Sequence, residues 1–385
     1  MKNLKNLFTL LILVVITSCS KDSDTPPTSV APIAITPLSS TDIYIAGFTR
    51  NINNKEVPTI WKNGVPTILP SDLNVLTLVS KVFVSGNDVY AINENDDTNS
   101  ILLWKNGIIV QTIPNSVAYE FIVVGSDVYI LGQTANVFKI WKNGVETILT
   151  NNSFNNFVLK MKVVNGDVYA AGSERVGTKN IAKFWKNGAA TAISNTSLNS
   201  FVDDFEVVNN EVTILFRERN DATTETLKVW KNGNTVTLES GLRFDGIGNG
   251  FIETVGNTQF VVTQQDLGSG NQKIILFKNG IKSNISSGTL SYFPRDMKVV
   301  GSDVHVLATE RNIANSANTT IFKYFKNTQE TILLNGFGGS FFNSSMTISN
   351  NGDVHIAALN KYFKNNNATI LLGVSPEATG IFAVN

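Results

Sequence analysis

The chain has 385 residues, of which 42% are apolar, a composition typical of a globular protein with a substantial core. Its 31 basic residues balance its 31 acidic residues, so it lacks the overall positive field of nucleic-acid-binding proteins. The single cysteine excludes an intramolecular disulfide, and no group of His, Cys and Asp residues has zinc-binding spacing. We therefore expect no nucleic-acid partner, no cofactor and no metal.

The N-terminus has the pattern of a targeting segment. Lys2 and Lys5 precede an apolar run, residues 7–16, that is too short to span a bilayer comfortably. The run leads into Ile16-Thr17-Ser18-Cys19, which resembles a bacterial lipobox. This resemblance implies that residues 1–18 are removed as a signal peptide and that Cys19 carries lipid. An ordinary secretory signal with an incidental cysteine is the alternative.

The segment 19–41 is expected to be the lipidated cysteine and a flexible tether. Residues 20–24, Ser-Lys-Asp-Ser-Asp, resemble the export signal that follows the lipidated cysteine of Bacteroidota surface lipoproteins, although a solvated linker has a similar composition. Residues 25–40 are rich in Pro, Ser and Thr, as extended tethers are. We expect a lipid anchor in the bacterial outer membrane and exposure at the cell surface.

Residues 42–385 contain a repeat built around the phrase Trp-Lys-Asn-Gly. Its aromatic residues are 37 to 48 residues apart, the length of a four-stranded propeller blade. The first five copies begin with all five tryptophans of the chain, and the last three begin with Phe. The eight aromatic positions are Trp61, Trp104, Trp141, Trp185, Trp230, Phe277, Phe325 and Phe363.

One blade can be interpreted directly from residues 77–113. Alternating apolar and polar residues predict strands over 77–84, 88–92, 101–104 and 108–113. Asn106-Gly107 is expected to form a type I′ hairpin turn, because both of its residues tolerate positive φ. The second strand recurs as Asp-Val-Tyr, for example at 88–90 and 127–129.

The two ends of the repeat region complement each other. The first repeat begins at its second strand, near Asp42, and residues 379–385 have the pattern of a first strand with no second strand after it. We therefore predict an all-β domain, residues 42–385, in which the C-terminal strand fills the innermost place of the first blade and closes an eight-bladed propeller. The irregular sixth and eighth repeats leave seven blades as the alternative.

Two recurring phrases carry a resemblance to a known family. Val-Tyr-Ala-Ala-Gly at 168–172 and Phe-Trp-Lys-Asn-Gly at 184–188 resemble the kelch-like propeller repeats of a family of Bacteroidota surface lipoproteins. The resemblance covers residues 42–385 and implies a propeller fold. It implies no activity.

The lysine of the repeated phrase is interpreted as structural. An acidic residue precedes the second strand in seven repeats, with Gln259 as the exception, and this turn should lie on the same face as the lysine. The two rings of opposite charge nearly cancel, so they generate no strong field. His305 and His355 occupy the position that is Tyr elsewhere, which favours packing over metal or acid–base chemistry.

The variable segments between strands two and three, and between blades, are expected to form a binding face. Arg together with Tyr or Phe is the composition of interaction hot spots, and variable loops on a rigid scaffold commonly bind partners. The candidate binding residues are Arg50, Glu174, Arg175, Arg217, Arg219, Arg243, Phe244, Tyr292, Arg295 and Arg311.

These patterns favour a monomeric, non-enzymatic binding or scaffold propeller that recognises a glycan or protein through its long-loop face. The alternative is an envelope glycan hydrolase or lyase at the central channel, which needs converging carboxylates. The carboxylates available for it near the starts of first strands are Glu120, Asp203, Asp204, Asp245 and Asp296. Docking of other outer-membrane components is a third possibility. The loop 93–99 lacks the Gly and the closing Glu of a calcium loop.

Overall fold

The computed structural model describes residues 42–71, 77–93, 100–151, 156–221, 223–243, 250–268, 270–287, 291–311, 319–338, 344–373 and 375–384. These residues form 32 β-strands and no helix, and all the strands belong to the unit Leu38–Asn385. The described part therefore contains no helix that could cross a bilayer. The fold is all-β, as predicted.

The strands form eight four-stranded antiparallel blades, numbered here in chain order and described from the centre outward. Blade 1 consists of β32 (Glu377–Ala383), β1 (Ile43–Arg50), β2 (Glu56–Lys62) and β3 (Val65–Ile68). Blade 2 consists of β4 (Val79–Ser85), β5 (Asp88–Asn93), β6 (Ser100–Lys105) and β7 (Ile108–Pro114). Blade 3 consists of β8 (Ser116–Val124), β9 (Asp127–Thr134), β10 (Val137–Lys142) and β11 (Val145–Ile148).

The next three blades follow the same order. Blade 4 consists of β12 (Phe157–Val164), β13 (Asp167–Val176), β14 (Lys179–Lys186) and β15 (Ala189–Ala192). Blade 5 consists of β16 (Asn199–Val208), β17 (Glu211–Arg219), β18 (Thr224–Lys231) and β19 (Asn234–Arg243). Blade 6 consists of β20 (Phe251–Val255), β21 (Thr258–Gly268), β22 (Asn271–Lys278) and β23 (Ile281–Asn284).

The last two blades complete the set. Blade 7 consists of β24 (Ser291–Val300), β25 (Asp303–Arg311), β26 (Thr319–Lys326) and β27 (Gln329–Gly338). Blade 8 consists of β28 (Ser344–Ile348), β29 (Val354–Ala358), β30 (Lys361–Lys364) and β31 (Asn367–Ile370). A single parallel bridge, Gln272 to Ser291, links blades 6 and 7 into one eight-stranded sheet.

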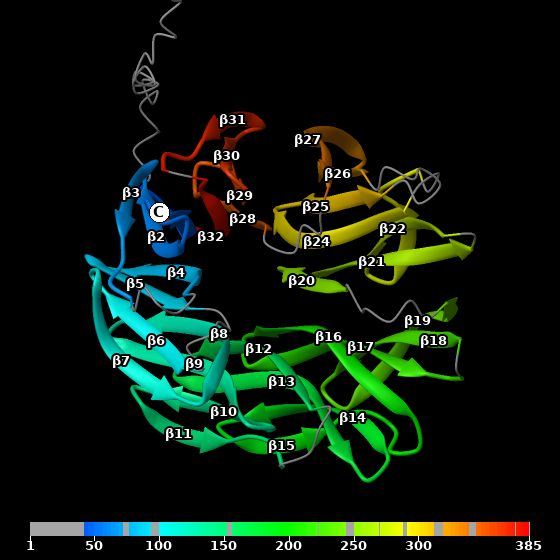
Figure 1. Cartoon of the computed structure of the whole chain (residues 1–385). Helices are drawn as coiled ribbons and strands as arrows, with labels where there is room; N and C mark the ends of the chain where they lie inside the picture. Colours follow the sequence, from blue (N-terminus) through cyan, green and yellow to red (C-terminus); the bar gives the residue numbers. More distant parts are fainter. Residues whose placement is uncertain are drawn as a thin grey trace, which may run out of the picture. The chain divides into compact units, whose positions relative to one another are not determined.

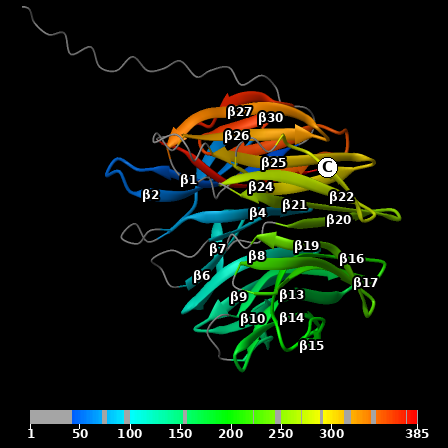
Figure 2. The same cartoon turned by 90° about the vertical axis from the view of Figure 1, so that its right-hand side faces the viewer.

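The blades follow one another around a closed ring (Figure 1). Each innermost strand contacts the innermost strand of the next blade, from β4 through β28 to β32 and back to β4. Seen from the side, the strands of successive blades lie one above another (Figure 2). The eight-bladed prediction is therefore confirmed, and the seven-bladed alternative is wrong.

The ring is closed as the sequence predicts. Strand β32 pairs antiparallel with β1, with Ile381 opposite Ile45 and Ala383 opposite Ile43. The register shifts between Ala46 and Gly47. A Cβ atom on Gly47 would lie 1.9 Å from the Glu377 carbonyl oxygen, so only glycine allows β32 to approach here.

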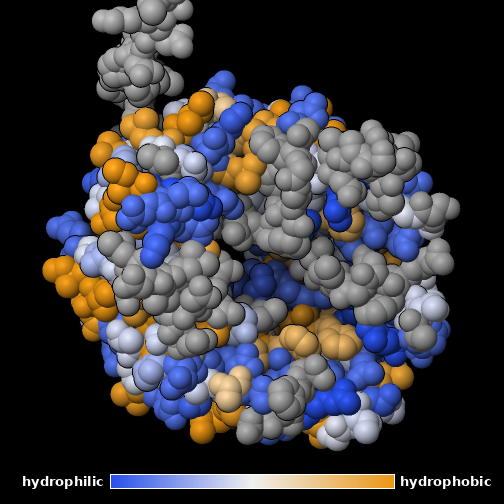
Figure 3. Space-filling model, viewed as in Figure 1, coloured by the Kyte–Doolittle hydropathy of each residue, from blue (hydrophilic) through white to orange (hydrophobic). Residues whose placement is uncertain are grey.

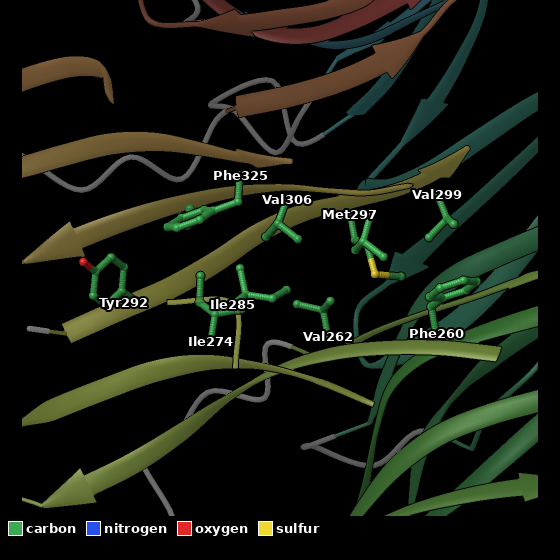
Figure 4. Packing of buried hydrophobic residues seen from close by; sticks show 11 residues of the cluster. Phe260, Val262, Ile274, Ile285, Tyr292, Met297, Val299, Val306 and Phe325 are labelled. Carbon is green, nitrogen blue, oxygen red and sulfur yellow. The ribbon is translucent and has the colours of Figure 1, made fainter. Parts of the chain in front are cut away.

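Eight apolar clusters hold the ring together, because a single blade cannot cover both of its faces. The cluster between blades 6 and 7 shows the arrangement (Figure 4). Phe260 and Val262 of β21 pack with Met297 and Val299 of β24. Stability is therefore distributed over eight similar interfaces.

Candidate functional site

The Asn-Gly of the repeated phrase forms the hairpin turn predicted for it. In blade 1, Asn63 has φ of 49° and Gly64 has φ of 82°. The Asn63 side chain accepts a hydrogen bond from the Ile43 backbone N–H at 2.8 Å and donates one to Asp42 Oδ1 at 2.7 Å. This Asn therefore joins the outer turn of a blade to the turn next to the channel.

The lysine of the phrase lies opposite the turn acid, as predicted. Lys62 Nζ is 2.8 Å from Asp42 Oδ2 and 5.4 Å from the centre of the Tyr44 ring. Hydrogen bonds from Lys62 and Asn63 lower the pKa of Asp42. The other six ion pairs are Lys105–Asp88, Lys142–Asp127, Lys186–Asp167, Lys231–Glu211, Lys326–Asp303 and Lys364–Asp353. Seven of the eight lysines of the phrase are therefore neutralised by an acid.

The prediction that Gln259 occupies the turn-acid position is wrong by one residue. The backbone N–H of Gln259 donates to Asn279 Oδ1, as that of Val128 does to Asn143 Oδ1. Thr258 is therefore the residue equivalent to the turn acid. Lys278 of the same blade lies over the Phe260 ring at 5.4 Å.

The aromatic residue of the phrase belongs to the core. Trp61, Trp104 and Trp185 are completely buried, and each indole N–H donates to a carbonyl oxygen of the preceding blade's outgoing segment. The acceptors are Leu372 for Trp61, Pro70 for Trp104 and Leu149 for Trp185. These three side chains are thus inaccessible to a sugar ring.

The two histidines are buried, as their Tyr-equivalent position predicts. His305 Nδ1 lies 2.6 Å from the Tyr324 hydroxyl, and His355 Nδ1 lies 2.7 Å from the Tyr362 hydroxyl. Ser349 Oγ lies 3.1 Å from His355 Nε2. Burial lowers the pKa of His355 to about 4. Both histidines therefore serve packing within their blades.

Three of the residues predicted for the binding face are buried, so their expected exposure is wrong. The Arg217 side chain is 4% exposed and its Nε lies 2.7 Å from Asp203 Oδ2. Tyr292 is 3% exposed and packs in the cluster between blades 6 and 7. Glu174 accepts a hydrogen bond from the Asn151 backbone N–H at 2.8 Å, which links blade 4 to blade 3.

The other predicted binding residues lie nearer to solvent. Arg311 is exposed at the end of β25, and Arg175, Arg219 and Arg50 are half-buried at strand ends. Arg50 pairs with Glu56, Arg175 donates to Asn180 Oδ1 at 3.1 Å, and Arg219 stacks over Phe201. The Arg243 side chain and Phe244 lie outside the described residues, as do Asp245 and the loop 94–99. The expectation that these positions are loops is wrong, because every described candidate residue lies within a strand or at its last residue.

A second recurring ion pair explains why acids appear at these strand ends. Glu174, Glu218 and Glu310 each lie seven residues after the turn acid, and each pairs with the lysine two residues before the repeat aromatic. These lysines are Lys183, Lys228 and Lys323. The spacing of the pair was visible in the sequence and identifies these acids as structural.

The innermost strands enclose a central cavity of about 890 Å³. The face shown in Figure 3 is hollowed at its centre, with hydrophilic residues inside. Ten charged side chains line the cavity. They are the acids Glu120, Asp204, Glu206, Glu253 and Asp296, and the bases Lys81, Lys160, Lys162, Arg295 and Lys298.

Most of the acids in the cavity are held by lysines. Lys81 Nζ lies 2.6 Å from Glu120 Oε1, and Lys162 Nζ lies 2.7 Å from Glu206 Oε1. Two looser pairs join Lys160 to Asp204 at 3.6 Å and Lys298 to Asp296 at 3.8 Å. The lining is therefore close to electrically neutral.

Glu253 is the exception in this lining. No ion pair among the described residues includes it, and its Oε2 accepts a hydrogen bond from the Val299 backbone N–H at 2.9 Å. Burial raises the pKa of Glu253 to about 7, against the lowering effect of Lys298. Burial also raises the pKa of Glu206 on the neighbouring strand.

The sequence prediction found part of the cavity lining. Glu120, Asp204 and Asp296 line the cavity, whereas Asp203 is turned into the blade interface toward Arg217. Glu206 and Glu253 were missed. Each lies five residues before the turn position of its blade, as Lys162 and Lys298 do in blades 4 and 7. Comparing this position across the repeats could therefore have identified all four residues.

The described residues contain no group of three or more His, Cys, Asp or Glu side chains positioned to hold a metal ion. Eight of the ten charged side chains of the cavity are arranged as acid–base pairs around its wall. An ammonium, carboxylate or hydroxyl group of a ligand can therefore find either a positively or a negatively charged partner in this lining.

Comparison with known proteins identifies the fold. No family model and no curated protein matches the sequence. The structure is similar to a prolyl endopeptidase, at TM-score 0.50 and 9% identity over 80% of this chain and 50% of that one. It is also similar to the dihydro-haem d1 dehydrogenase NirN, at TM-score 0.52 and 8% identity over 88% and 74%.

A puromycin-hydrolysing peptidase of Mycobacterium tuberculosis matches at TM-score 0.49 and 7% identity, over 84% of this chain and 57% of that one. The chain thus spans about half the length of the peptidases it matches. At these identities the likeness shows a β-propeller and no activity.

Proposed function

We propose that this protein is a lipid-anchored, non-enzymatic binding propeller of the bacterial cell surface, with a glycan or protein partner. The observation that carries the proposal is the cavity lining, in which four of five acids are already held by lysines. Paired acids of this kind favour recognition over acid–base chemistry, because catalysis needs an available proton donor or acceptor.

The partner is proposed to bind on the face where strands two and three of each blade meet. Arg311 is exposed on this face, and Arg295, on the adjacent strand β24, lines the cavity. Burial lowers the pKa of Arg295, and the nearby charge of Arg311 lowers it further, because the two guanidinium groups repel each other. An acidic or hydroxyl-rich partner relieves this repulsion.

A binding experiment tests the proposed face. The soluble form, residues 25–385, is incubated with glycan arrays and with envelope extracts. Replacing Arg175 and Arg311 by Glu should abolish partner capture, whereas Lys142→Glu on the opposite, short-turn face should leave it unchanged. Capture that survives the double variant contradicts the proposed face.

The lipid anchor is tested separately. Cys19→Ala should prevent incorporation of labelled fatty acid and release the protein from the membrane fraction. Protease added to intact cells should remove the protein from the surface. Full protection from the protease contradicts surface exposure.

Glu206 and Glu253 favour one second candidate, an envelope glycan hydrolase or lyase. They lie on neighbouring innermost strands of the cavity, and the pKa of Glu253 is about 7, suited to a general acid. Turnover of a glycan that is lost in both Glu253→Gln and Glu206→Gln supports this candidate. Partner binding without turnover supports the binding propeller.

A further inference from the structure

We infer that the central cavity is a binding site for a small ligand with one ammonium group on an apolar body. The ammonium lies at Glu253 and the apolar body lies against Phe83 and Ile122. This site differs from the face proposed for a macromolecular partner, so either proposal can fail alone.

Such a ligand supplies the ion-pair partner that Glu253 lacks among the described residues. Its neighbour Glu206 is held by Lys162 at 2.7 Å, and Asp296 lies 3.8 Å from Lys298. Glu253 is half-buried in the cavity wall and forms no ion pair among the described residues. An ammonium ion supplies the opposite charge and the N–H donors that a buried carboxylate requires.

The cavity wall opposite Glu253 is apolar at the same level, where a level means the equivalent register position on each innermost strand. Phe83 pairs with Tyr90 and Glu253 pairs with Phe260, which are equivalent positions of blades 2 and 6. Blades 2 and 6 are four places apart in a ring of eight, and Figure 1 shows β4 and β20 across the centre from each other. Phe83 therefore faces Glu253.

The apolar wall is a continuous arc. Ile122 of blade 3 lines the cavity beside Phe83. Phe382 of blade 1 packs against the Phe83 ring, with centroids 4.7 Å apart, but is not among the residues that line the cavity. The same level carries Lys162, Glu206, Glu253 and Lys298 on blades 4 to 7. At this level blades 1 to 3 thus carry apolar residues, blades 4 to 7 carry charged residues and blade 8 carries Thr347.

The flanking lysines limit the ligand to one positive charge. Lys162 and Lys298 lie on the strands either side of Glu206 and Glu253, and Lys160 lies one level away, over the Phe251 ring at 5.8 Å. A second ammonium would meet these cations. The volume of about 890 Å³ lies within the range of small-molecule pockets.

Calorimetry with three probes of one shape tests the inference. Phenethylamine should bind the soluble wild-type protein, 2-phenylethanol should bind at least tenfold more weakly, and 3-phenylpropionate should not bind. Glu253→Gln should weaken phenethylamine at least tenfold. The matched control Glu120→Gln removes a cavity carboxylate that Lys81 holds, and it should change the affinity less than threefold.

The apolar wall and the pH give two further readouts. Phe83→Ala should weaken both the amine and the alcohol, and the amine should bind more tightly at pH 8 than at pH 6, where Glu253 is more protonated. Wild-type protein that ignores phenethylamine at millimolar concentration, or equal affinity for amine and alcohol, overturns the inference. An unchanged affinity in a folded Glu253→Gln variant also overturns it.

Discussion

Trp104 of blade 2 donates its indole N–H to the carbonyl oxygen of Pro70, which follows the outermost strand of blade 1, at 2.9 Å. The same bond recurs from Trp61 to Leu372 and from Trp185 to Leu149. The repeated aromatic therefore ties each of these blades to the segment that leaves the blade before it.

Trp104→Phe should lower the free energy of unfolding by about 1–2 kcal/mol, because it removes the N–H donor and leaves a carbonyl oxygen unpaired. Trp104→Ala should cost about 3–5 kcal/mol through the cavity it creates. Chemical denaturation measures both. Ile108→Thr, at an exposed position of the same blade, should stay within about 0.5 kcal/mol of wild type.

Removal of β32 should open the ring. A chain ending at Gly373 leaves the inner edge of β1 unpaired and exposes the apolar residues that β32 covers. We expect a loss of at least about 4 kcal/mol, and thermal unfolding by circular dichroism should show a lower melting temperature. Gly47→Ala should also destabilise, because its Cβ would meet the Glu377 carbonyl. An unchanged melting curve for the truncated chain contradicts closure by β32.

Arg217→Ala should destabilise the protein by about 3–5 kcal/mol, since it removes the buried cation that pairs with both Asp203 and Glu225. Arg311→Ala, at an exposed strand end, should change stability by less than about 0.5 kcal/mol. Urea denaturation separates the two. Equal losses of stability in the two variants would contradict the prediction that the buried Arg217 stabilises the protein more than the exposed Arg311.

Glu253 should make the protein less stable as the pH rises from about 5 to 8. Its pKa is about 7 in the folded protein and near 4.5 when unfolded, so the folded state binds the extra proton between these values. Glu253→Gln should therefore raise the stability at pH 8 by on the order of 2 kcal/mol, with a smaller gain at pH 5. Melting temperatures at the two pH values measure the difference.

His355 should have the opposite effect at lower pH. Its pKa is about 4 in the folded protein and 6.5 when unfolded, so the unfolded state binds the extra proton between these values. Stability should fall by roughly 2–3 kcal/mol as the pH drops from 6.5 to 4. A His355→Gln variant should lose this part of the pH dependence. Parallel curves of unfolding free energy against pH for the variant and the wild type would contradict the prediction.

The blade count and the closure could be predicted because they depend on local signals. Asn-Gly turns and alternating strands recur at each blade, and the missing first strand of blade 1 matches the extra strand at 379–385. The turn position of blade 6 is not acidic, but Val255-Gly256-Asn257-Thr258 has the spacing of Val300-Gly301-Ser302-Asp303, and this spacing identifies Thr258.

The candidate site was harder to predict because exposure depends on strand length. Arg217 and Glu174 read as loop residues, but β17 and β13 extend past them and bury both side chains. Polar residues at strand ends can form hydrogen bonds or ion pairs between blades, or they can bind a partner. The sequence alone does not distinguish these two roles. Glu206 and Glu253 were harder to identify because most blades contribute only one or two of the cavity charges.

The pairing of β32 with β1 also governs the timing of biogenesis. More than 300 residues separate the two strands in the chain, so β1 has no inner neighbour until residues 377–383 have been synthesised. Every incomplete chain therefore presents an open strand edge, which is a template for aggregation and a target for proteases. Chaperones that shield strand edges should thus be required until β32 has paired with β1.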